Sequence, residues 1–161
     1  HHWNNSSWVN PVSVTRDGIT FNGETAEANA LDYYEEVNFT ATLRGSTGEP
    51  STLITSTGYA TRIGRVVQYS IGFEDKSTTG YAGSVTFTGL PFTNNGGRAI
   101  GNIVGYTGLA WAGSDCFTKT ETGSTIIEAM NISSNAVWNS ATHNAGGGRY
   151  FWLTGTYMTT A

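Results

Sequence analysis

The sequence predicts an all-β protein, an antiparallel β-sandwich of jelly-roll type with a short N-terminal strand pair and one short helix. Apolar and polar residues alternate with a period of two over many short segments, which is the pattern of half-buried strands. Charged residues make up only 12% of the chain, while 21 of its 161 residues are glycine. This composition favours many tight connections between strands. The segments give about eight strands at the spacing of a sandwich or jelly roll.

The clearest alternation lies in residues 58–92. Its first run alternates between an apolar face and a largely polar one (Val67, Tyr69, Ile71 and Phe73 against Val66, Gln68, Ser70 and Gly72). Val85 and Phe87 repeat the pattern. The residues between the two runs are charged and then rich in Ser, Thr and Gly, which favours a solvated turn. The two runs are therefore expected to pair with each other, and Pro91 is expected to end the second one.

The N-terminal part predicts two short strands and a helix. Val12 and Val14 alternate with polar neighbours, Asp17-Gly18 is a turn signal, and residues 19–21 continue as a second strand. Residues 24–36 contain alanines and leucine that favour helix and glutamates that suit a helix N-terminus. This helix is expected either to pack on the following sheet or to meet copies of itself.

The later segments complete the predicted sheet. Strands are expected at residues 37–43, 52–61, 98–106, 109–112, 115–119, 125–132 and 150–159. Residues 133–148, which end in three consecutive glycines, are expected to form a long loop.

Composition excludes several classes of partner. The formal net charge is −4, and no cluster of Lys and Arg provides the basic surface that nucleic acid requires. No apolar run approaches the roughly 20 residues of a membrane helix, so membrane insertion is not expected. Cys116 is the single cysteine, so no intrachain disulfide can form. No residue spacing indicates a metal site or a cofactor.

Four segments in a fixed order carry a family resemblance. They are ITFNGETAEANALDYYEE (19–36), FTATL (39–43), GYATRIGRVVQYSI (58–71) and SVTFTGLPF (84–92). Together they resemble the C-terminal module of many bacteriophage tail fibres and tailspikes. The family's Gly-Thr-Trp-Thr-Pro opening is replaced here, with Phe39 in place of the tryptophan and Ala41 in place of the proline. The resemblance from Arg98 onward is only general.

The resemblance implies a jelly-roll sandwich that assembles as a homotrimer at the distal tip of a phage fibre. There it would lie on the virion, outside the cell, and bind a bacterial surface glycan or another host receptor. Residues 1–36 would form a strand–helix linker and trimerisation element, and residues 37–161 a receptor-binding head. One alternative is a structural trimerisation or capping domain without receptor contact. A second is an accessory domain of a polysaccharide-degrading tailspike.

Glycan recognition directs attention to aromatic residues with polar neighbours, because sugars stack on aromatic faces and hydrogen-bond to amides and acids. Trp138, with Asn139 and His143 nearby, is the first candidate, since no periodic strand claims it. Trp111 with Asp115 is the second, although a place in the sheet core is the favoured alternative for Trp111. His143 could be an ordinary loop histidine. Several weak sites on one trimer would add avidity.

Other residues receive a structural interpretation. Trp152 alternates with Tyr150 and is expected in the core, and residues 74–76 are expected at the tip of a solvated turn. Glu128 lies on a strand face and is expected either at an exposed edge or in an ion pair. Ser114, Asp115 and His143 are residue types of a catalytic triad, but no Gly-x-Ser-x-Gly turn accompanies them. We therefore expect no enzymatic activity and no catalytic residues.

Overall fold

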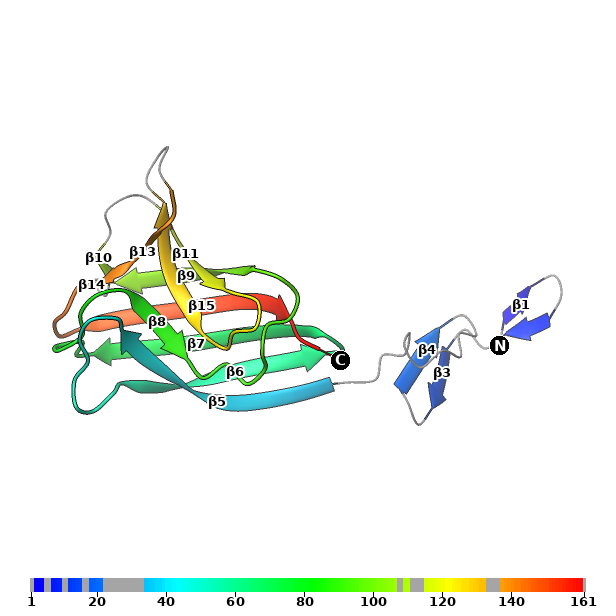
Figure 1. Cartoon of the computed structure of the whole chain (residues 1–161). Helices are drawn as coiled ribbons and strands as arrows, with labels where there is room; N and C mark the ends of the chain where they lie inside the picture. Colours follow the sequence, from blue (N-terminus) through cyan, green and yellow to red (C-terminus); the bar gives the residue numbers. More distant parts are fainter. Residues whose placement is uncertain are drawn as a thin grey trace.

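The structure is a computed structural model of the chain, and it is all-β (Figure 1). It describes residues 2–4, 7–9, 12–15, 18–21, 34–106, 109–110, 115–132 and 137–160. Within these residues every regular element is a strand and no helix occurs. The predicted all-β class is therefore confirmed.

Eight strands form the body of the protein. They are β5 (Tyr34–Gly45), β6 (Thr55–Ile63), β7 (Val66–Lys76), β8 (Val85–Thr88), β9 (Ala99–Tyr106), β11 (Asp115–Thr120), β12 (Ile127–Ile132) and β15 (Arg149–Met158). Their hydrogen-bonded order is β11-β9-β15-β7-β6-β5-β8-β12, and β12 pairs back onto β11. All pairings are antiparallel. The sheet thus closes on itself as an eight-stranded barrel.

The predicted sandwich is wrong in this respect. An alternation of period two places one face inward in a sandwich and in a barrel alike, so it cannot separate the two. The closing pair β11–β12 decides between them. It runs from Asp115 opposite Ile132 to Lys119 opposite Glu128, and it removes the free edges that the two sheets of a sandwich would keep.

The expected pairing of the two runs in residues 58–92 is also wrong. Strand β7 pairs with β6 and β15, whereas β8 pairs with β5 and β12. The alternation in β7 is correct, since Val67, Tyr69, Ile71 and Phe73 are buried. However, β7 continues to Lys76, into the residues expected to form the turn, and the chain then crosses to the other side of β5 before β8 begins.

Aromatic rings fill the barrel interior. Phe73, Phe87 and Phe151 are fully buried, and their ring centroids lie 5.5 to 6.4 Å apart. Burying a side chain of this size contributes roughly 1.5 to 3 kcal/mol. The remaining core is aliphatic and aromatic, and it includes Leu43, Val67, Val85, Ile127, Leu153 and Tyr157. The C-terminal strand β15 supplies Phe151, Leu153 and Tyr157 from between β7 and β9, so the last strand completes the core.

Two glycines let large rings lie against neighbouring strands. Gly58 of β6 lies under the ring of Phe39, where a Cβ atom would overlap the ring. A Cβ on Gly155 of β15 would lie 2.5 Å from the hydroxyl of Tyr69, its partner on β7. Glycine within a strand commonly marks such a close approach.

Two hairpins precede the barrel in sequence. Strand β3 (Val12–Thr15) pairs with β4 (Gly18–Phe21), which confirms the predicted strand pair. A further hairpin, β1 (His2–Asn4) with β2 (Ser7–Val9), was not predicted. Of the predicted helix at 24–36, residues 24–33 lie outside the described part of the chain. Residues 34–36 belong to β5, because Tyr34 and Glu36 pair with Ile63 and Thr61.

Short strands interrupt the predicted 133–148 loop. Strand β13 (Asn139–Ser140) pairs with β12, and β14 (Thr142–His143) pairs with β10 (Leu109–Ala110). Ala141 lies between them, where its amide donates to Ala129 and its carbonyl accepts from Val85. This segment is therefore fixed to the end of the barrel near β8 and β12.

Candidate functional site

Trp138 lies on the surface just before β13. Its side chain is 46% exposed. The ring packs against Phe117 at 76° with centroids 5.2 Å apart, and the Arg98 guanidinium lies 5.8 Å from the ring centroid. Such aromatic and cation–π contacts hold the indole without covering it. We call Trp138, Phe117 and Arg98 the Trp138 corner.

Charged groups beside the Trp138 corner neutralise one another. Arg98 Nε donates to both carboxylate oxygens of Glu121, at 3.0 and 3.1 Å. Lys119 Nζ lies 3.0 Å from Glu121 and 2.8 Å from Glu128. The hydrogen bond from Arg98, with that from Lys119, lowers the pKa of the Glu121 carboxyl. Glu128 was expected either at an exposed edge or in an ion pair, and it is paired with Lys119. The two cations and two carboxylates of this group balance in charge.

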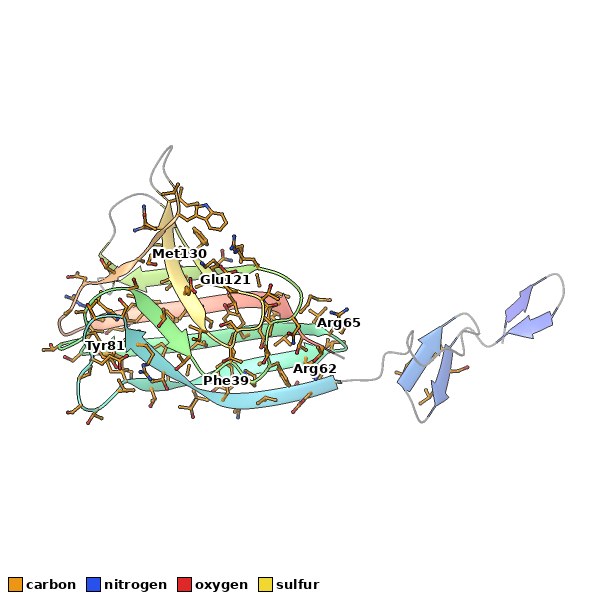
Figure 2. All side chains as sticks on the ribbon, in the orientation of Figure 1. Phe39, Arg62, Arg65, Tyr81, Glu121 and Met130 are labelled. Carbon is orange, nitrogen blue, oxygen red and sulfur yellow. The ribbon has the colours of Figure 1, made fainter. Side chains whose placement is uncertain are left out.

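The other members of the predicted Trp138 group have separate positions. Asn139 is exposed in β13, where its side-chain amide donates to the Val137 carbonyl at 3.2 Å. His143 is half-buried in β14, and its ring stacks on Tyr81 with centroids 5.1 Å apart. Its described contacts do not include Trp138. Figure 2 shows Tyr81 at the end of the barrel opposite Arg65, so His143 belongs to that end.

The contacts of His143 indicate a structural role. Its Nε2 lies 3.0 Å from the Arg44 carbonyl oxygen, which fixes Nε2 as the protonated nitrogen. Nδ1 is buried without a hydrogen-bond partner. Burial lowers the pKa of the imidazole, against the opposing effects of the Arg44 carbonyl and the Glu49 charge. His143 therefore stays neutral and holds β14 against Arg44.

The second predicted pair is described only in part. Trp111 lies outside the described residues. Asp115 begins β11, where its backbone pairs with Ile132. The side chains of this predicted pair lie outside the described part of the chain.

A surface that the sequence did not indicate lies on the outer wall of the barrel. Trp152, expected in the core, is 41% exposed there, because Phe151 and Leu153 are the inward residues of β15. The indole Nε1 donates to Glu74 at 3.2 Å, and the ring stacks on Tyr150 with centroids 5.6 Å apart. The predicted alternation of β15 is correct, but Trp152 lies on its outward face and not on the predicted inward face.

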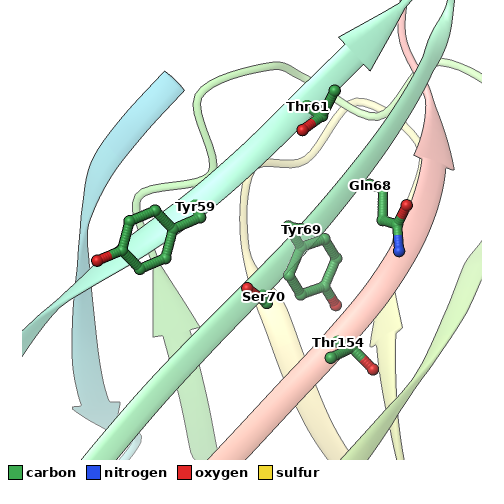
Figure 3. Close-up of a pocket in the computed structure, with 6 residues that line it drawn as sticks. All are labelled: Tyr59, Thr61, Gln68, Tyr69, Ser70 and Thr154. Atoms are coloured by element: carbon green, nitrogen blue, oxygen red, sulfur yellow. The ribbon is translucent and has the colours of Figure 1, made fainter. Parts of the chain in front are cut away.

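A shallow depression adjoins Trp152 on the same wall. It has a volume of about 290 Å³ and is lined by Tyr59, Thr61, Gln68, Tyr69, Ser70 and Thr154 from β6, β7 and β15 (Figure 3). Tyr59, Ser70 and Thr154 lie side by side in register across the three strands. We call Tyr59, Gln68, Ser70, Thr154 and Trp152 the wall platform. In the sequence these residues are marked only as outward positions of their strands, and nothing in the sequence indicates that they lie together.

The described residues offer little for other chemistry. Among them, no group of three or more His, Cys, Asp and Glu side chains could hold a metal ion. The Nδ1 atom of His143 meets no carboxylate, so the described contacts form no triad around it. In the described part of the chain, no helix is long and apolar enough to span a membrane.

Comparisons with known proteins add no relative. No family model matches the chain, and no curated protein matches it.

Proposed function

We propose that this chain is a non-enzymatic receptor-binding module of a phage tail fibre or tailspike, which attaches the virion to a glycan on the bacterial surface. The observation that carries the proposal is the half-exposed indole of Trp138, held in place by Phe117 and Arg98. An exposed, fixed aromatic ring offers a sugar its apolar face at little entropic cost. The amide of Asn139 follows directly in the chain and supplies polar contacts.

The phage assignment is supported by the place of the resembling segments in the fold. Residues 39–43, 58–71 and 84–92 contribute to β5, β6, β7 and β8. These strands are neighbours in the order β8-β5-β6-β7. Three of the four resembling segments therefore cover one continuous half of the barrel wall, whereas the Trp138 corner lies in the other half. A shared scaffold with a variable binding region is the usual division in recognition proteins.

In this proposal the chain acts as a homotrimer, with the residues before β5 leading from the fibre shaft to the barrel. Three copies of one weak site raise the overall affinity for a repetitive surface through effective concentration. The charge balance around Arg98, Glu121, Lys119 and Glu128 leaves stacking and hydrogen bonds as the main source of specificity.

The test is binding of Trp138→Ala to an array of bacterial capsule and O-antigen saccharides and to host cells. We expect at least about a tenfold loss of binding, the loss typical of an interface hot spot. Val137→Ala is the matched control, because Val137 is the neighbouring residue and is 78% exposed. Circular dichroism and light scattering check the fold and the oligomer. Unchanged binding by a folded Trp138→Ala trimer would contradict saccharide binding at the Trp138 corner. Release of reducing ends from the same saccharides would contradict a non-enzymatic module.

A second candidate function, the structural cap of a fibre trimer, is favoured by one observation. Tyr34, Ile63, Val66 and Met158 are exposed apolar residues. They are paired in one lateral row across β5, β6, β7 and β15, at the end of the barrel where β5 begins. Such a row would be covered if copies of the chain pack together there.

Light scattering tests the cap directly. Val66→Lys places a charge in the middle of the row, so we expect the trimer to dissociate at micromolar concentration. Thr154→Lys adds the same charge on the same face away from the row and is the control. A wild-type chain that is monomeric at micromolar concentration contradicts both the cap and the trimer. A Val66→Lys trimer as stable as the wild type contradicts the role of the row.

A further inference from the structure

We infer that the wall platform is a second saccharide-binding site, separate from the Trp138 corner, and that it binds a neutral oligosaccharide. The inference adds a second site and a narrower ligand class to the proposed function. It rests on the proposed function only in taking the ligand to be a saccharide. Five features of the wall support it: its flanking aromatics, its lining, the fixed position of Trp152, the bulge beside it and the local charge.

Two exposed aromatic side chains flank the wall platform. Tyr59 on β6 is 58% exposed, and Trp152 on β15 is 41% exposed. Tyr59 shares a row with Thr154 on β15, two strands away, and Trp152 lies two residues before Thr154 on that strand. The two aromatic residues are therefore two strand spacings apart across the sheet and two residues apart along the strand. This corresponds to about 12 Å between Cα atoms, room for about two linked pyranose rings. The flanking rings therefore suit an oligosaccharide better than a single sugar.

The lining beside Tyr59 offers neutral hydrogen-bonding groups. Ser70 on β7 and Thr154 on β15 share the row of Tyr59, and Gln68 with Thr61 forms the next row, on the side away from Trp152. Hydroxyls both donate and accept, and an amide has both functions on one planar group. Sugar hydroxyls have the same dual capacity. The depression is thus matched to a polyhydroxylated ligand that stacks on Tyr59 at its edge (Figure 3). Such a ligand reaches Trp152 one residue pair beyond the row of Tyr59 and Thr154.

Trp152 is held in one orientation before any ligand binds. Its indole extends over Gly72 of β7, where a Cβ atom would lie 3.4 Å from Cδ1. Nε1 donates to Glu74 Oε1, and Tyr150 stacks on the ring at an interplanar angle of 22°. A ring fixed on three sides loses little conformational entropy on binding, so more of the stacking energy appears as affinity.

A β-bulge next to Trp152 places the carboxylate that fixes it. The register of β7 and β15 shifts between Arg149 and Phe151, so Glu74 and Asp75 together face Tyr150. Both acidic side chains are consequently exposed. Asp75 has a φ of 48°, in the left-handed region that non-glycine residues rarely adopt. Bulges often re-aim side chains beside functional sites, and retained backbone strain is concentrated at such sites.

The charge near the wall platform selects the kind of sugar. The six residues that line the depression include no carboxylate, lysine or arginine. Glu74 and Asp75 border the platform at its Trp152 end, and the chain carries a formal charge of −4. Lys76 and Arg149 pair with each other beyond this acidic pair, on the side away from Trp152. An anionic saccharide that extends from the uncharged depression past Trp152 would therefore meet Glu74 and Asp75 first. A neutral oligosaccharide meets no such penalty.

The experiment is a titration of the full-length chain, labelled with nitrogen-15, followed by backbone amide chemical shifts. The probes are neutral hexaoses of glucose, galactose and mannose, with hexagalacturonate as the acidic probe of equal length. We expect at least one neutral hexaose to shift the amides of β6, β7 and β15 around Ser70, and hexagalacturonate to leave them unchanged. Trp152→Ala and Tyr59→Ala should each weaken this binding by about tenfold or more.

One variant serves as a control. Ile126→Ala truncates an exposed side chain outside the wall platform and should not change hexaose binding. Because Tyr59 is more exposed than Trp152, Tyr59→Ala remains informative if Trp152→Ala fails to fold. The inference is overturned if no neutral hexaose shifts these amides, if hexagalacturonate binds them better, or if Tyr59→Ala binds as the wild type does. Loss of array binding in Trp138→Ala alone leaves the corner as the only site.

Discussion

The position of β15 in the barrel can be tested by a double-mutant cycle on Gly155 and Tyr69. The two residues are register partners, and a Cβ on Gly155 would lie 2.5 to 2.6 Å from the hydroxyl and ring carbons of Tyr69. Tyr69 is buried and its ring cannot move into solvent. Gly155→Ala should therefore lower the free energy of unfolding by about 1 to 3 kcal/mol, the usual cost of overpacking.

The sign of the effect should reverse once the ring is removed. Tyr69→Ala alone should cost about 3 to 5 kcal/mol through the cavity that it leaves. In that background the added methyl meets no ring, and alanine is favoured over glycine in a strand by roughly 0.5 to 1 kcal/mol. Gly155→Ala should then be neutral or stabilising, which gives a coupling energy of about 1.5 to 4 kcal/mol between the two sites.

Urea unfolding followed by circular dichroism measures all four free energies. Gly147→Ala is the control, because no heavy atom lies within 4 Å of its added Cβ, and it should change stability by less than about 0.5 kcal/mol. Equal costs of Gly155→Ala with and without the Tyr69 ring would refute the register of β15 against β7. The placement of Trp152 and Thr154 beside β7 would then fail with it.

Two further predictions concern polar groups that the barrel buries. His143 has a folded-state pKa below its ordinary 6.5. The unfolded chain therefore takes up its proton first as the pH falls, and the free energy of unfolding decreases below that value. Between pH 7.5 and 5.5, His143→Gln should lose less of its free energy of unfolding than the wild type does, and an equal loss would contradict the buried neutral imidazole. Asn94 is fully buried, and its side-chain amide lies within hydrogen-bond distance of the backbone carbonyls of Gly97, Thr120 and Glu121. Asn94→Ala should cost about 2 to 3 kcal/mol in urea unfolding, whereas the exposed Asn95→Ala should cost little; similar small losses for both would contradict the network.

Local alternation predicted the strands because it depends only on neighbouring residues. The inward faces of β5, β7 and β8 follow from it, and so does the β3–β4 hairpin with its Asp17-Gly18 turn signal. The partner of each strand depends on contacts between distant segments, which alternation does not encode. For this reason the β11–β12 closure was not predicted, and β8 was assigned to β7 in place of β5 and β12.

The same limit explains the candidate sites. Trp138 was predicted because it stood outside any periodic strand, and the structure places it at the surface. Trp152 was assigned to the core because aromatics in a strand are usually inward, yet Phe151 and Leu153 occupy that face. The wall platform joins residues from β6, β7 and β15 that are up to 95 positions apart, from Tyr59 to Thr154. Only the fold brings them together.

The central claim is that the chain binds saccharides of a bacterial surface. The most direct measurement applies the wild-type, full-length chain to an array of purified bacterial capsule and O-antigen saccharides, at concentrations where light scattering reports its oligomer. The account predicts saturable binding to a limited set of saccharides, reduced in Trp138→Ala and retained in Val137→Ala. A folded trimer that binds no saccharide on the array and none of its host cells would contradict the claim.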